Sequence, residues 1–280
     1  MQNIREKILS WGYVLDDVPG NVPFVFGGTR CSLETAADYI GAKNLIYMNS
    51  MYSPEQLRKR HPSVNPCSGE GTLSDKYFRH LSKYDSVMCA LERGRYTECA
   101  TEISRFSLTH PNVKGAVFDD FCVPAVAGTM ISPEQLGEIR AALRSHNPDL
   151  KLHIVTFDYQ NPKDLVPYLD HFDELSRWSW VPTLDYWNKY YFEVSNLKRI
   201  TNKPVIQGIY IHDFGIDSES PVPMDIFQLS IKKICQYSLG GQLDGFIIPQ
   251  AGWFCHEKHR EHIQWMKNYI DWFCGTTTVR

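Results

Sequence analysis

The sequence lacks any apolar run that approaches the roughly 18 residues of a membrane-spanning helix. Its first residues, MQNIREKILSWGY, carry charges inside their apolar pattern and contain no signal-peptide core. Clusters of lysine and arginine are also missing, because the 29 basic and 32 acidic residues are intermixed and leave a net charge of -3. These absences predict a cytoplasmic protein without a nucleic-acid or membrane partner.

Paired cysteine motifs are absent as well. None of the eight cysteines forms a Cys-x-x-Cys pair, and several lie in segments predicted to be strands or helices. Buried free cysteine behaves as a small apolar residue. We therefore expect reduced thiols, as in an intracellular compartment, rather than a disulfide framework.

The most informative stretch that is present is Val113–Phe121, VKGAVFDDF. Its apolar run has no helical period and lies between Pro111-Asn112 and a loop with proline and glycine, as is typical of a parallel strand buried on both faces. The run ends in two adjacent acids, Asp119 and Asp120. Two carboxylates at such a point repel each other and lose solvation, which proteins tolerate mainly where the charges are used.

Apolar runs and helix signals alternate along the whole chain of 280 residues. Residues 1–21 are predicted to be a helical lead-in, with a short helix over Ile4–Trp11. The predicted strands cover residues 22–28, 44–49, 85–91, 113–119, 150–157, 174–178, 204–211 and 243–248. The links from helix to strand are short, whereas the links from strand to helix are long and rich in Trp, His, Asp and Arg. This asymmetry predicts an α/β fold, a single (β/α)8 TIM barrel over residues 1–280. An open doubly wound sheet is the alternative, but Gly27-Gly28-Thr29-Arg30 is not its glycine-rich phosphate turn.

In such a barrel the strand ends meet at one mouth. The side chains expected there are Arg30, Asn49, Glu92, Asp119, Asp120, Asp158, Arg177, Trp178, Tyr210, His212, Asp213 and Gln250, with Trp180 and Trp253 in flanking loops. Acids and amides bind hydroxyl groups, and aromatic rings stack on the C–H faces of sugars, so this set favours a carbohydrate substrate. The absence of lysine at the strand ends argues against a phosphate ligand and a Schiff-base aldolase.

The Asp-Asp end of the fourth strand resembles the β-N-acetylglucosaminidases of glycoside hydrolase family 84, and more loosely the chitinase family. The resemblance covers about nine residues, and the chitinase spacing DxxDxDxE is absent because no Glu stands two residues after Asp120. It implies that Asp119 polarises a 2-acetamido group of the substrate, which attacks the anomeric carbon, and that Asp120 is the general acid/base.

A plainer carboxylate pair is also open, with Asp120 acting together with Asp158 or Glu92. A separation of about 5 Å would give retention and about 6.5–9.5 Å inversion. Since neighbouring strand residues point to opposite sides, one of the two aspartates could instead pair with an arginine or cap a helix. Asp158 could likewise only cap the next helix. Which of Asp119 and Asp120 is the general acid stays open at this point.

The remaining candidates have structural interpretations too. Trp178 and Trp180 could fill the core, and Arg30 and Arg177 could merely neutralise acids. Glu92, Asp120, Asp158 and His212 could hold a metal ion, as in a sugar isomerase. His256, His259 and His262 are predicted to form a solvated helix face, because HEKHR fails the HExxH pattern.

We therefore expect a glycosidase without metal or cofactor, with Asp119, Asp120 and Asp158 as its catalytic candidates. The alternatives are a non-catalytic barrel that binds glycans through Trp178, Trp180 and Trp253, and a metal-dependent sugar isomerase.

Overall fold

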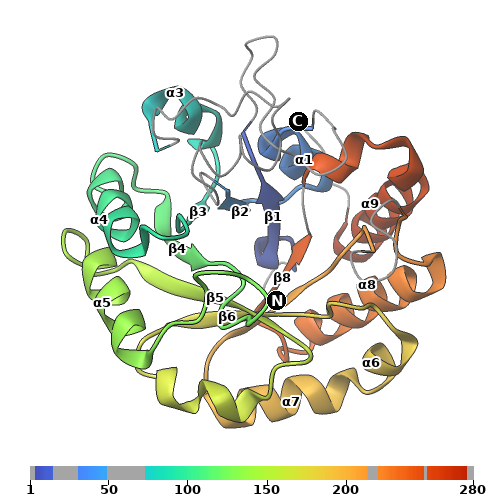
Figure 1. The fold of residues 1–280 in the computed structure, drawn as a ribbon. Coiled ribbons are helices and arrows are strands. Elements are labelled where there is room, and N and C mark those ends of the chain that lie inside the picture. Colours follow the sequence, from blue (N-terminus) through green and yellow to red (C-terminus); the bar gives the residue numbers. More distant parts are fainter. Residues whose placement is uncertain (1–3, 15–30, 49–72, 214–219, 249–250, 276–280) are drawn as a thin grey trace.

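The chain forms a closed barrel of eight parallel strands in sequence order (Figure 1). The computed structural model describes residues 4–14, 31–48, 73–213, 220–248 and 251–275. The strands are β1 (Ile8–Gly12), β2 (Asn44–Tyr47), β3 (Ser86–Ala90), β4 (Val113–Phe118), β5 (Lys151–Phe157), β6 (Glu174–Trp178), β7 (Val205–Gly208) and β8 (Gly245–Ile248). The predicted single-domain (β/α)8 barrel is confirmed.

Helices surround the barrel in the described part of the chain (Figure 1). The α-helices are α1 (Leu33–Ile40), α3 (Asp75–Phe78), α4 (Tyr96–Phe106), α5 (Pro133–Leu143), α6 (Leu184–Asn188), α7 (Tyr190–Thr201), α8 (Met224–Leu239) and α9 (Arg260–Cys274). The 3-10 helices are η1 (Ile4–Lys7), η3 (Arg79–Leu81), η4 (Pro162–Tyr168), η5 (Ala251–Cys255) and η6 (Glu257–His259). Among these described helices, none combines the length and the apolar character that crossing a bilayer requires.

Strand alternation divides the core into two layers. Inward-facing side chains such as Trp11, Val117 and Trp178 fill the barrel, whereas neighbours such as Phe118 pack outward against the helices. Because both layers are apolar, the strands read as continuous apolar runs. The same alternation places Asp119, two residues after Val117, on the inner side of the barrel.

The first strand is the main correction to the sequence prediction. The segment Ile4–Trp11 was expected to be helical, but its described residues form η1 and then β1, which pairs with β2 and β8. Ile4, Ile8 and Trp11 fit a helical period, yet all five residues of β1 are buried. A short strand buried on both faces has no alternation to distinguish it from a helix. The strand predicted at residues 22–28 lies outside the described residues.

Two helical segments depart from a regular α-helix. The chain breaks at Lys189 between α6 and α7, and residues 162–168 form the 3-10 helix η4, which contains Pro167. Proline removes an α-helical hydrogen bond and clashes with the preceding turn, which favours the tighter winding. Ser32 and Ser132 are the N-cap residues of α1 and α5, and Gly41, with a left-handed backbone, ends α1.

Candidate active site

The turn after β4 carries the acid pair at the mouth of the barrel. Asp119 and Asp120 expose 14% and 20% of their side chains. Asp120 has a backbone φ of 52°, in the left-handed region that few residues other than glycine adopt. Gln160, from the connection after β5, supports this turn by donating to the Phe121 carbonyl at 2.8 Å and the Cys122 carbonyl at 3.1 Å. The turn is therefore held by its neighbouring strand unit, in a strained form that is common at functional sites.

Arg93, just beyond β3, distinguishes the two acids. Its guanidinium donates directly to the Asp120 carboxylate, whereas the nearest Asp119 oxygen is 4.0 Å away. Burial and the Asp120 carboxylate raise the pKa of Asp119 to about 8, and Arg93 opposes this rise. Burial also raises the pKa of Asp120, again opposed by Arg93. The surroundings thus favour one proton shared between the two carboxyls near neutral pH, and Asp119 is the carboxyl that is protonated more readily.

Glu92, two residues after β3, is held by a different arginine. Its carboxylate accepts a hydrogen bond from Arg95 at 2.9 Å, and its side chain is 13% exposed. It follows Ala90 with inward phase, so strand alternation brings it to the mouth. Glu92 remains a candidate for substrate contact.

Asp158 organises the loop after β6 rather than capping a helix. Its carboxylate accepts from the Ser179 hydroxyl at 2.9 Å and from the Trp180 backbone N–H at 3.2 Å. These bonds occupy one lone pair on each oxygen and fix the position of Trp180. Asp158 thus positions the loop after β6, and its catalytic role stays a prediction.

An aromatic wall, formed by Tyr159, Trp180 and Tyr210, stands next to the acids. Trp180 and Tyr210 meet edge to face with centroids 6.2 Å apart, and Tyr159 is 55% and Trp180 39% exposed. Burial raises the pKa of Tyr210, and the negative charges of Asp120 and Asp119 add to the rise, which places its hydroxyl within their electrostatic reach. Such a wall next to carboxylates can stack against a sugar ring.

Two predicted substrate-binding residues are buried instead. Arg177 faces the outer layer, where its guanidinium donates to the Asp158 and Gln160 carbonyls at 3.1 and 2.9 Å. Trp178 is 3% exposed, meets Trp11 edge to face at 5.5 Å and donates to the Ser176 hydroxyl. Their positions favour structural roles. Arg177 stabilises the loop after β5, and Trp178 fills the interior of the barrel.

His212 and Trp253 also lie away from an open surface. Their rings stack with centroids 4.0 Å apart, and His212 is 1% and Trp253 4% exposed. His259 and His262, predicted to be solvated, are buried at 0% and 6% exposure, which corrects that prediction. The reason is that η6 and α9 turn these two histidines toward His212 and Val222.

The residues predicted as possible metal ligands do not form a metal site in the described part of the structure. Within the described ranges, which include Glu92, Asp120, Asp158 and His212, no group of three or more His, Cys, Asp or Glu side chains is arranged to hold a metal ion. The three tryptophans expected to bind glycans likewise do not share one face, since only Trp180 is substantially exposed.

Three candidates, Arg30, Asn49 and Gln250, lie outside the described residues. Conversely, sequence reasoning missed Arg93, Tyr159 and Gln160. Arg93 and Tyr159 directly follow a chosen acid, and Gln160 stands two residues after Asp158, so position was the available signal. Arg93 and Gln160 contact the turn after β4, and Tyr159 lies within electrostatic reach of Asp120.

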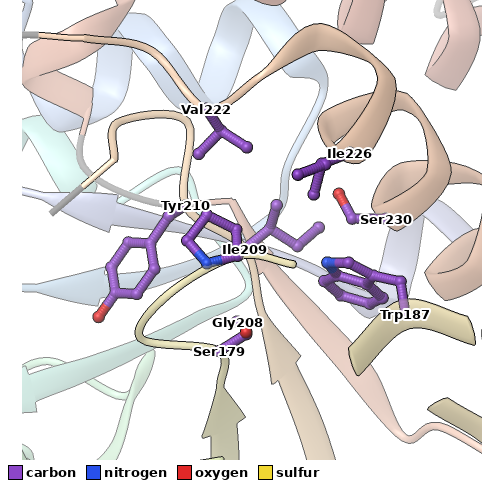
Figure 2. Close-up of a pocket in the computed structure, with 9 residues that line it drawn as sticks. Ser179, Trp187, Gly208, Ile209, Tyr210, Val222, Ile226 and Ser230 are labelled. Atoms are coloured by element: carbon purple, nitrogen blue, oxygen red, sulfur yellow. The ribbon is translucent and has the colours of Figure 1, made fainter. Parts of the chain in front are cut away.

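Two cavities lie elsewhere. Figure 2 shows Tyr210 and Trp187 on opposite sides of Ile209. The three residues line a cavity of about 10 Å³, which holds one water molecule at most. A cavity of about 350 Å³ lies on the outer wall and is lined by residues of α1, η5 and α9, such as Tyr39, Phe254 and Ile263, without a carboxylate. Neither cavity combines acids with an open aromatic wall, which only the mouth does among the described residues.

Comparisons with known proteins show the fold. No family model and no curated protein matches the chain. A glycoside hydrolase family 113 β-1,4-mannanase is 14% identical with a TM-score of 0.60, over 97% of this chain and 99% of that one. A family 5 mannosidase from Rhizomucor miehei, in complex with mannosyl-fructose, is 13% identical with a TM-score of 0.60, over 89% and 88%. The tryptophan synthase α-subunit from Pyrococcus furiosus is 13% identical with a TM-score of 0.54, over 96% and 98%. At such identities these structures share the barrel with this chain, and sites on a shared barrel differ widely.

Proposed function

We propose that the protein is a glycoside hydrolase whose Asp119–Asp120 pair cleaves a glycosidic bond at the barrel mouth. The observation that carries this proposal is a buried carboxyl, Asp119, with a pKa raised to about 8, next to a carboxylate paired with Arg93. Two acids kept in different protonation states are the basis of glycosidase chemistry. The mannanase and mannosidase with the same barrel support this class of activity.

Asp119 is the general acid in this proposal. It is protonated at neutral pH, faces the barrel interior and lies near the aromatic wall that would hold the sugar. Its proton passes to the leaving-group oxygen as the bond from that oxygen to the anomeric carbon breaks. A water oxygen then bonds to the anomeric carbon and returns a proton to Asp119. Asp120, paired with Arg93, stabilises the positive charge of the transition state when it is ionised.

These roles are the reverse of those implied by the resemblance to family 84. If the substrate carries a 2-acetamido group, the ionised Asp120 is the better acceptor for the acetamido N–H, and Asp119 the better proton donor. Acetamido assistance itself stays a prediction, and it separates N-acetylhexosaminides from mannosides and fucosides as substrates.

The test is Asp119→Asn on a panel of aryl glycosides that includes mannosides, fucosides and N-acetylglucosaminides. Loss of general acid catalysis should lower kcat/KM by about 10²–10⁴-fold for poor leaving groups. The loss should be smaller for dinitrophenyl leaving groups, which need no protonation. For the wild type, activity should fall as pH rises through about 8, because only protonated Asp119 donates.

Asp149→Asn is the matched control, since Asp149 is exposed in the short link from α5 to β5, at the opposite end of the barrel. Its kinetics should equal those of the wild type. Full activity in Asp119→Asn would refute the assigned role. Sugar binding by the wild type without turnover of any panel member would replace the enzyme with the glycan-binding barrel.

A further inference from the structure

Histidines of η6 and α9 hold both ends of the connection between β7 and α8. His212, four residues after β7, has its Nδ1 3.1 Å from His259 Nε2. At the other end, His262 Nε2 donates to the Val222 carbonyl at 2.7 Å, two residues before α8 begins. The sequence separations are 47 and 40 residues, so these contacts exist only in the folded barrel.

The first contact continues into a chain of three imidazoles. His259 Nδ1 lies 3.2 Å from His256 Nδ1, and the opposite end of the chain, His212, stacks on Trp253. His212 and His259 are 1% and 0% exposed, while His256 is half-buried. Protons can therefore reach the chain most readily through His256.

Proton counting shows what this chain can accept. Each of its two links needs one proton between two nitrogens, and a neutral chain of three imidazoles carries three protons on six nitrogens. One added proton can occupy the second terminal nitrogen and leaves both links intact. A second added proton must place two N–H groups face to face, which breaks a link.

The surroundings oppose protonation. Burial and the neighbouring His212, His256, His262 and Lys258 lower the pKa of His259 to about 3. Burial also lowers the pKa of His262, whose Nδ1 has no hydrogen-bond partner among the described residues. The remaining charged groups on the described residues of the packed elements are Asp213, Asp225, Lys232, Lys233, Glu257, Arg260, Glu261, Lys267 and Asp271.

We propose that His212, His256 and His259, together with the His262–Val222 bond, form a pH-sensitive latch that fixes residues 209–213 and 220–223, the described ends of the connection between β7 and α8, against η6 and α9. The latch is closed when the chain is neutral or carries one extra proton, and it opens when the second proton arrives. Tyr210 of the aromatic wall lies two residues before His212, so the latch also positions one side of the mouth. The proposal does not depend on glycosidase activity.

The test is urea unfolding of the wild type and His259→Gln between pH 7.5 and 4.5. A site that binds protons in the unfolded but not in the folded chain costs stability as pH falls below the unfolded pKa, about 6.5. The wild-type folding constant should therefore lose an additional factor of about ten per pH unit for each such proton. In His259→Gln, where residue 259 cannot bind a proton, the part of this pH dependence that comes from His259 should be absent. In the exposed control His146→Gln, that part should remain as in the wild type.

A second measurement uses the wild type alone, in case His259→Gln does not fold. Nitrogen chemical shifts of the histidine rings should show His259 neutral at pH 5.5, and Trp253 fluorescence should change only at lower pH, where the latch opens. Trp253→Phe should lack that fluorescence change. A His259 that titrates at 6.5 or above, or equal pH slopes in the wild type and His259→Gln, would overturn the proposal.

Discussion

Asp119 and Asp120 are neighbours in the chain but have different electrostatic surroundings. Asp120 leaves the strand with a left-handed backbone and meets Arg93, whereas Asp119 continues the inward phase of β4 into a low-dielectric interior. Charge repulsion between them is large at such proximity, so sharing one proton lowers the free energy of the pair. Arg93 bonds directly to Asp120 and only approaches Asp119, so its charge favours the ionised form of Asp120 over that of Asp119.

Removing Arg93 tests this directly. In Arg93→Gln the attraction that opposes protonation of both acids is lost, so the pKa of Asp119 should rise above 8 by about one unit or more. Carboxyl ¹³C titration measures the shift without a substrate, and the alkaline limit of activity should move upward with it. Arg95→Gln, two residues away and paired with Glu92 and Glu102, should leave the titration of Asp119 unchanged.

At the scale of elements, β6 and β7 depend on one close contact inside the barrel. Gly208 of β7 faces the Trp178 indole, and a Cβ added there would overlap the ring. Trp178 in turn packs against Tyr210 with centroids 4.8 Å apart. The absence of a side chain at Gly208 on β7 leaves the space that the Trp178 indole on β6 occupies.

Gly208→Ala should therefore destabilise the protein by about 1–3 kcal/mol, since overpacking forces the ring or the strand to move. Urea denaturation measures this loss. Gly137→Ala in α5 is the comparison, because its added Cβ would lie 2.9 Å from the side chain of half-buried His171, which can rotate away. Alanine also suits a helix better than glycine, so that variant should be neutral or more stable. Equal losses in both would contradict the interior contact.

At the scale of the whole molecule, Arg5 connects the start of the barrel to its last helix. Its guanidinium donates to Asp271 of α9 at 2.7 Å, to the Ile40 carbonyl at the end of α1 at 3.1 Å and to the Gly275 carbonyl. Arg5 is 4% exposed. Lys267 and Arg5 lower the pKa of Asp271, so this contribution to stability is present at neutral pH and decreases as pH falls below the carboxyl range.

Arg5→Met should lower the free energy of unfolding by about 1.5–3 kcal/mol at pH 7, because charged hydrogen bonds are lost and their acceptors stay largely buried. Thermal or urea unfolding measures it, and the difference from wild type should shrink in acid. Lys189→Met removes an exposed ion pair with Asp185 and should change stability by less than about 1 kcal/mol. A pH-independent difference for Arg5→Met would argue against the role of Asp271.

Local sequence patterns predict most strands of the barrel. Apolar runs identified β2 to β8, and the acids directly after β4 were identified because a charge at the end of a buried run is visible in sequence. β1 was missed, because a five-residue strand buried on both faces carries no period of its own.

The sequence by itself determined the fold class and the placement of polar residues at the carboxyl ends of the strands, since both follow from short-range periodicity. Only the tertiary structure decided that Asp119 is largely buried while Arg93 bonds to Asp120, that Asp158 and Arg177 hydrogen-bond to loop residues, and that His259 is buried against His212. Burial and electrostatic surroundings depend on residues that barrel closure brings together from distant parts of the chain. Local sequence patterns do not contain that information.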